Sequence, residues 1–98
     1  MIYVCIMDYG DKADIERVRP RHQAYQFKLI DEGTVIAAGS LLQPDDGGLF
    51  LYEAPSLEVA QRLVDNDPYI REGCIPRYRL RKYEIHGANA SLLRATDP

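Results

Sequence analysis

A histidine and an aspartate, each close to a proline, are the side chains of this sequence best suited to proton-transfer chemistry. His22 lies two residues after Pro20, and Asp67 directly precedes Pro68. Imidazole gains and loses a proton near neutral pH, and a carboxylate bonded to one ring nitrogen determines which nitrogen accepts a proton. The pair is therefore a candidate general base with its orienting partner. The alternative is that the two side chains only tie two helix ends together through a hydrogen bond.

Three further side chains close to this pair in the sequence, or in the expected fold, are candidates for binding a substrate. Arg19 offers a planar fork of donors that suits a carboxylate or a phenolate, although a solvated arginine in a turn is an equal alternative. Tyr69 can stack on a ring or donate a hydrogen bond, or it can simply pack as an anchor. Ser40, at or just beyond the end of a predicted strand, lacks the context of a nucleophile, so we expect a hydrogen-bond donor only.

The two cysteines and two histidines do not have the spacing of a metal-binding or redox motif. Cys5 lies in an apolar run, Cys74 in a loop-like segment, and His86 at the end of the last predicted strand. No glycine-rich phosphate loop follows a strand. We therefore expect that the protein requires no metal, haem or flavin, and that both thiols are reduced, as is usual in the cytoplasm.

Composition excludes several classes of partner. The chain has 98 residues, 46% of them hydrophobic, and a net charge of −3. An acidic chain of this size is expected to be one domain that binds neither nucleic acid nor an anionic membrane as its main partner. No apolar run approaches the roughly 20 residues of a membrane helix. The opening segment lacks the basic residues and cleavage site of a signal peptide, so a cytoplasmic location is expected.

The first half of the chain predicts a strand followed by a helix. Residues 2 to 7 are rich in β-branched and aromatic side chains, which is typical of a strand. Proline is favoured at the first helical position, so the main helix is expected to begin near Pro20 and to end before Gly33. His22 would then lie in the first helical turn, where the helix dipole disfavours an imidazolium and keeps the ring able to accept a proton.

The second half predicts two strands, a helix and a last strand. The strands are expected over residues 34–38, 49–54 and 78–85. Ser56 is expected to cap the second helix. That helix should close at Asp67, because the residue before a proline avoids helical geometry.

The predicted order β-α-β-β-α-β is that of the ferredoxin-like fold, an α+β arrangement of four antiparallel strands with both helices on one face. Its central strands are the first and third, whose apolar residues do not alternate with polar ones, which indicates that both faces are covered. We therefore expect a homodimer through the open sheet face, with Tyr52 pointing outward; a few exposed apolar side chains are the alternative. Residues 1–86 are expected to form this domain and residues 87–98 a C-terminal tail.

Several short motifs occur in the order found in one known family. They are Met1-Ile2-Tyr3-Val4, Arg19-Pro20-Arg21-His22, Asp31-Glu32-Gly33, Ala38-Gly39-Ser40, Ser56-Leu57-Glu58-Val59-Ala60, and Asp67-Pro68-Tyr69 followed by Gly73. Over residues 1 to about 85 the sequence resembles the YCII-related (YciI-like) proteins. The resemblance implies a dimeric α+β barrel of ferredoxin-like domains, with His22 and Asp67 as the active-site dyad. One branch of the family contains a dehydrochlorinase that acts on chlorinated hydroxyquinols, and most members have no assigned reaction.

This sequence departs from the family where many members have Gly-Pro and this chain has Gly39-Ser40, which adds a hydroxyl near the expected site. Two classes of function remain open. One is a cofactor-independent lyase, dehydrochlorinase-like, or an isomerase, in which His22 acts as base on a small cyclic or aromatic acid. The other is a non-catalytic dimeric module that binds a metabolite or a partner protein. A closed polar pocket around His22 would favour chemistry.

Overall fold

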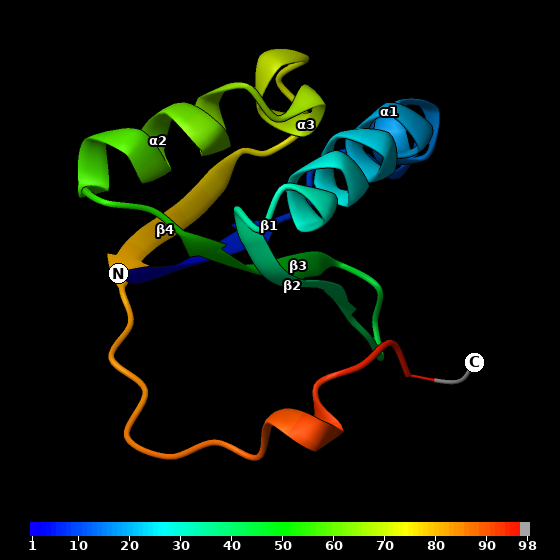
Figure 1. Cartoon of the computed structure of the whole chain (residues 1–98). Coiled ribbons are helices and arrows are strands. Elements are labelled where there is room, and N and C mark those ends of the chain that lie inside the picture. Colours follow the sequence, from blue (N-terminus) through cyan, green and yellow to red (C-terminus); the bar gives the residue numbers. More distant parts are fainter. Residues whose placement is uncertain (97–98) are drawn as a thin grey trace.

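The computed structural model describes residues 1–96, and its elements follow the predicted order with one short helix added before the last strand (Figure 1). The strands are β1 (Ile2–Asp8), β2 (Val35–Leu41), β3 (Gly47–Glu53) and β4 (Arg77–Lys82). The helices are α1 (Lys12–Asp31), α2 (Leu57–Asp65) and α3 (Pro68–Arg71), and a 3₁₀ turn spans Ala90–Leu92. The ferredoxin-like α+β fold is therefore confirmed.

The four strands form one antiparallel sheet in the order β2-β3-β1-β4, so β1 and β3 are central as predicted. All three helices lie on one face of the sheet, and the segment after β4 runs beneath the opposite face (Figure 1). Within residues 1–96, this arrangement leaves one face of the sheet without a covering α-helix.

The two faces of the central strands differ in burial. Cys5 and Tyr52 are fully buried under the helices, whereas Val4, Ile6 and Leu51 are half-buried on the open face. The prediction that Tyr52 points outward is wrong, because strand geometry alternates side chains even where the sequence is apolar throughout. The open face still carries an apolar strip along β1 and β3.

Helix α1 begins eight residues earlier than predicted, because Pro20 lies inside the helix rather than at its start. Asp11 is the N-cap: its carboxylate accepts hydrogen bonds from the backbone N–H groups of Ala13 and Asp14. Pro20 lies on the exposed side, where water can satisfy the carbonyl that loses its partner. His22 is therefore in the middle of α1, and the predicted effect of the helix dipole on its ring does not apply.

Other helix and strand boundaries also differ from the prediction. β2 extends to Leu41, so Ser40 lies within an edge strand and not at its end. The last strand ends at Lys82 and not at residue 85. Asp67 does not close α2; it is the N-cap of α3, with its carboxylate accepting from the backbone N–H of Tyr69. The cap of α2 by Ser56 agrees with the prediction. Of the predicted tail, residues 97–98 lie outside the described part of the chain.

Candidate functional site

His22 and Asp67 lie 45 positions apart in the sequence and are in direct contact. His22 Nδ1 is 2.8 Å from Asp67 Oδ1 and 2.9 Å from Oδ2. The middle of α1 supplies the histidine, and the start of α3 supplies the aspartate. The predicted pair is therefore formed, although neither residue lies at the helix terminus that the sequence indicated.

Asp67 is fully buried and is surrounded by hydrogen-bond donors. Besides His22, its carboxylate accepts from the backbone N–H of Tyr69 and from Gln26 Nε2, each at 2.9 Å. An ionised carboxylate is only an acceptor, so His22 Nδ1 must carry the shared proton. The neutral ring then has its acceptor at Nε2, which makes no hydrogen bond within residues 1–96.

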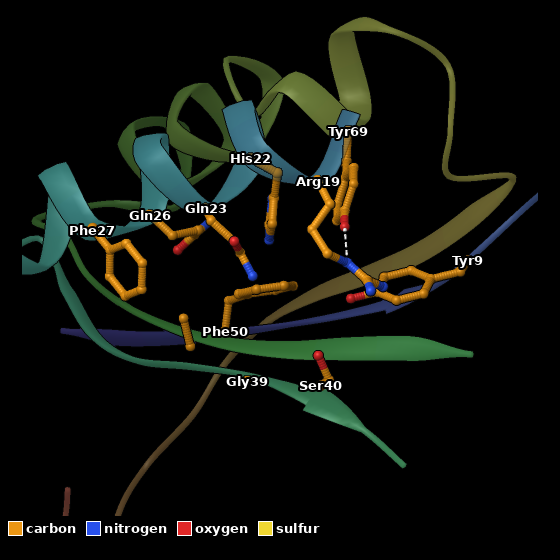
Figure 2. Close-up of a pocket in the computed structure, with 11 residues that line it drawn as sticks. Tyr9, Arg19, His22, Gln23, Gln26, Phe27, Gly39, Ser40, Phe50 and Tyr69 are labelled. Atoms are coloured by element: carbon orange, nitrogen blue, oxygen red, sulfur yellow. Dashed lines mark hydrogen bonds between the residues drawn. The ribbon is translucent and has the colours of Figure 1, made fainter. Parts of the chain in front are cut away.

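Aromatic rings on both sides hold the imidazole in one orientation. The rings of His22 and Tyr69 are stacked, with centroids 3.9 Å apart and an interplanar angle of 13°. The ring of Phe50 contacts that of His22 in a T-shaped arrangement, with ring centroids 5.2 Å apart. The His22 ring points from α1 toward the sheet, into the space shown in Figure 2.

That space is a small pocket of about 110 Å³ between α1 and the sheet. Tyr9, Arg19, Ser40 and Tyr69 form its polar end, and Phe27 lies at the opposite end (Figure 2). A cavity of about 150 Å³ in another protein holds one benzene-sized molecule. The pocket beside His22 is smaller than that cavity and partly open to solvent, so a single small ring, or an acid of similar size, would enter it only in part.

Arg19 joins the polar end to the rest of the site. Its Nε donates to the hydroxyl of Tyr69 at 3.2 Å, and this hydrogen bond raises the pKa of Arg19. A second, longer contact of 3.4 Å joins its guanidinium to Asp45. Burial raises the pKa of Tyr69, so its hydroxyl is protonated at neutral pH.

The structure brings all five predicted site residues to one place. His22, Arg19, Ser40 and Tyr69 line the pocket, and Asp67 lies behind His22 without lining it. Tyr69 packs as an anchor, with its ring against that of His22, and its hydroxyl also reaches the polar end of the pocket.

Several further residues of the site were missed, among them Gln26, Tyr9 and Phe50. Gln26 lies on the same helical face as His22 and bridges Asp67 and the hydroxyl of Tyr52, at 2.9 Å and 3.2 Å. Its spacing of four residues from His22, on an apolar stripe, was a sequence signal for this role. Tyr9 and Phe50 carried no such signal, because only the folded sheet brings them under α1.

The cysteines are not part of this site. Cys5 and Cys74 are both buried and unpaired, and burial raises the pKa of Cys5 to about 12. Among residues 1–96, no three His, Cys, Asp or Glu side chains are grouped as metal ligands would be. None of the helices in these residues combines the length and apolar composition needed to cross a membrane.

A ferredoxin-like domain with a buried His–Asp pair beside a small, partly open pocket is the class of protein that the fold and the site define. Residues 1–84 match the YCII-related domain, and the chain belongs to this family. It is 33% identical to Protein YciI of Escherichia coli O6:H1, in an alignment covering 86% of this chain and 97% of that protein. Protein YciI of Shigella flexneri gives the same values.

Solved structures show the same fold at low sequence identity. The 5-chloro-2-hydroxyhydroquinone dehydrochlorinase TftG of Burkholderia phenoliruptrix AC1100, in complex with 2,5-dihydroxybenzoquinone, is 18% identical and has a TM-score of 0.76. The match covers 89% of this chain and 96% of TftG. An antibiotic biosynthesis monooxygenase is 16% identical with a TM-score of 0.54, and the match covers 87% of this chain and all of that one.

Proposed function

We propose that this protein is a small cofactor-independent enzyme, a lyase or an isomerase, in which His22 removes a proton from a small cyclic or aromatic acid. The observation that carries the proposal is the buried contact of His22 with Asp67, which leaves Nε2 as the free acceptor beside a small, partly open pocket. A histidine that was fully packed, or fully solvated, would instead have favoured a non-catalytic binding module.

The roles of the two residues follow from their contacts. When Nε2 takes a proton from the substrate, His22 becomes an imidazolium, which the adjacent Asp67 carboxylate stabilises. The electron pair of the broken bond remains on the substrate. In an isomerase the proton returns at a different atom, and in a lyase the electron pair expels a leaving group such as chloride. Neither outcome requires an oxidant or a reductant.

The family and the fold support the lyase form. The chain belongs to the YCII-related family, and the dehydrochlorinase TftG shares its fold. Dehydrochlorination removes a proton and a chloride from one molecule, which is the chemistry that a single general base can start. The polar end of the pocket, formed by Tyr9, Arg19, Ser40 and Tyr69, offers donors to the oxygen atoms of such a substrate.

We also propose that the protein acts as a homodimer in the cytoplasm, with two copies meeting through the open sheet face. Val4, Ile6 and Leu51 form an apolar strip there that none of α1, α2 and α3 covers (Figure 1). The segment after β4 adds exposed apolar side chains on this side, among them Ile85 and Leu92 at 40% and 65% exposure. A domain of this size gains core by burying such a face against a second copy.

Chloride release and proton exchange test the catalytic proposal. The purified protein is given 5-chloro-2-hydroxyhydroquinone, and chloride release is measured; in parallel, NMR in heavy water follows ring proton exchange in 2,5-dihydroxybenzoquinone. We expect acceleration by the wild type, loss in His22→Gln and no change in His86→Gln, which alters an exposed histidine. Equal rates in the wild type and His22→Gln would refute His22 as the base. Binding of these compounds without any turnover would favour the alternative, a non-catalytic metabolite-binding or protein-interaction module.

A further inference from the structure

The polar end of the pocket is built from elements that are far apart in the sequence. Tyr9 follows β1, where its backbone N–H donates to the carbonyl of Asp46 at 2.8 Å. Arg19 extends from α1, and Tyr69 from α3. The rings of Tyr9 and Tyr69 meet edge to face with centroids 5.5 Å apart, and Figure 2 shows the Arg19 side chain reaching the same end of the pocket.

The hydroxyl groups at the polar end of the pocket can donate hydrogen bonds to a ligand. Arg19 donates to the oxygen of Tyr69, so the Tyr69 proton is directed elsewhere. The hydroxyls of Tyr9, Ser40 and Tyr69 line the same pocket, and none of them donates a hydrogen bond within residues 1–96. Their O–H groups are therefore available to an outside acceptor.

The only charged side chain that lines this pocket, among residues 1–96, is the cation Arg19. Arg19 contributes a permanent cation, and no carboxylate of residues 1–96 lines the pocket; Asp67 lies behind His22, and Asp45 meets Arg19 only at 3.4 Å. Burial raises the pKa of Tyr9 to about 12, so this hydroxyl stays protonated and remains a donor at neutral pH. A cation with protonated hydroxyls, partly shielded from water, is complementary to an oxyanion.

His22, the proposed base, and the polar end line the same small pocket. Tyr69 stacks on His22 with ring centroids 3.9 Å apart while its hydroxyl belongs to the polar end, and both residues line the same pocket. A ring whose carbon or hydroxyl loses a proton to His22 delocalises the negative charge onto a ring oxygen. Donors placed beforehand at that oxygen stabilise the charge as it develops.

We propose that Tyr9, Arg19 and Tyr69 form an oxyanion site for the phenolate or enolate oxygen of a single-ring substrate, with Tyr9 as a donor to that oxygen. The assignment of the reacting proton to His22 rests on the proposed function, but the binding of the anion does not. Removing one such donor in another enzyme lowers turnover by about 10² to 10³, and a comparable loss is expected on Tyr9→Phe for any substrate that His22 deprotonates.

The binding claim is tested with 4-nitrophenol, whose phenol and phenolate forms absorb at different wavelengths. At pH 6, where the free probe is mostly phenol, we expect the wild type to bind it as phenolate. Tyr9→Phe and Arg19→Gln should each weaken phenolate binding at least tenfold. Tyr78→Phe is the matched control, because its hydroxyl is paired with Gln61 outside the pocket. His22→Gln is compared with the wild type in turnover only, because His22 lines the same pocket.

The outcomes separate this proposal from the proposed function. Absence of phenolate binding by the wild type, or equal losses in Tyr9→Phe and Tyr78→Phe, overturns the oxyanion site. Circular dichroism melts verify that each variant is folded at the assay temperature, and Ser40→Ala provides a second perturbation of the same end, expected to weaken binding less than Tyr9→Phe. Phenolate binding that survives in every variant of the oxyanion site also overturns it. Intact phenolate binding without His22-dependent turnover leaves the oxyanion site and removes the catalytic proposal.

Discussion

Replacement of Asp67 by asparagine separates a catalytic role of the His22–Asp67 pair from a purely structural one. The substitution preserves size and shape in a fully buried position. Asparagine is also a good N-cap, so the bond from the backbone N–H of Tyr69 to this side chain can persist. The amide nitrogen of the new asparagine would face the side-chain amide of Gln26. The Gln26 amide can flip by 180° to accept from it, because Gln26 Oε1 has no hydrogen-bond partner within residues 1–96.

The hydrogen bonds can thus be re-formed in Asp67→Asn, and the negative charge is the main loss. Replacing bonds to a charged acceptor by bonds to a neutral one is expected to lower the free energy of unfolding by at most about 2 kcal/mol. The effect on turnover is larger, because Asp67 faces an imidazolium only after proton transfer. With His22 Nδ1 2.8 Å from the carboxylate, the charge centres are about 4 Å apart, and the attraction is about 4 kcal/mol at an effective dielectric constant near 20.

That attraction corresponds to a fall in turnover of about 10³. The assay is chloride release or proton exchange for wild type and Asp67→Asn, with urea unfolding of both and Asp65→Asn as a control at an exposed aspartate. The double variant His22→Gln/Asp67→Asn should be little slower than either single variant, because the two residues act as a unit. Turnover within tenfold of the wild type in Asp67→Asn, at unchanged folding, would refute the reasoning and leave the pair as a structural tie.

Three other outcomes are expected. Val4→Asp, on the apolar strip of the open face, should convert a dimer of about 22 kDa into monomers or unfold the protein in sedimentation experiments, and a wild type that is monomeric at all micromolar concentrations would contradict the dimer. Gly48→Ala should weaken binding of 4-nitrophenol, because a Cβ there would lie 2.6 Å from Phe50 Cζ and 3.1 Å from the Tyr9 hydroxyl; unchanged binding would show that these rings can move aside. Burial raises the pKa of Tyr9 and of Tyr25 to about 12 in the folded protein, so the folded state holds these protons more tightly than the unfolded state. The contribution of these two tyrosines to the free energy of unfolding should therefore be constant below pH 10 and fall between pH 10 and 12. Tyr25→Phe should reduce that fall in denaturant titrations at each pH.

Local patterns in the sequence were sufficient for the order of the elements. A run rich in β-branched and aromatic residues indicated β1, and a continuous apolar run of leucine and aromatic residues indicated β3. Ser56 indicated the start of α2, and all these features depend on neighbouring residues. The start of α1 was predicted wrongly from Pro20 alone. The cap at Asp11 and the helical spacing of the buried residues of α1 outweigh one lost hydrogen bond, so a longer-range pattern in the same sequence decided against a local one.

The sequence by itself also determined which side chains could transfer a proton, since His22 and Asp67 were singled out by residue type and by their prolines. Only the tertiary structure decided their geometry. Asp67 is buried because α3 places it against α1, and Tyr9 and Phe50 reach the pocket because the sheet passes beneath that helix. Proton transfer and oxyanion binding depend on distances of a few ångströms between residues dozens of positions apart, and such distances arise from packing rather than from any local preference of the chain.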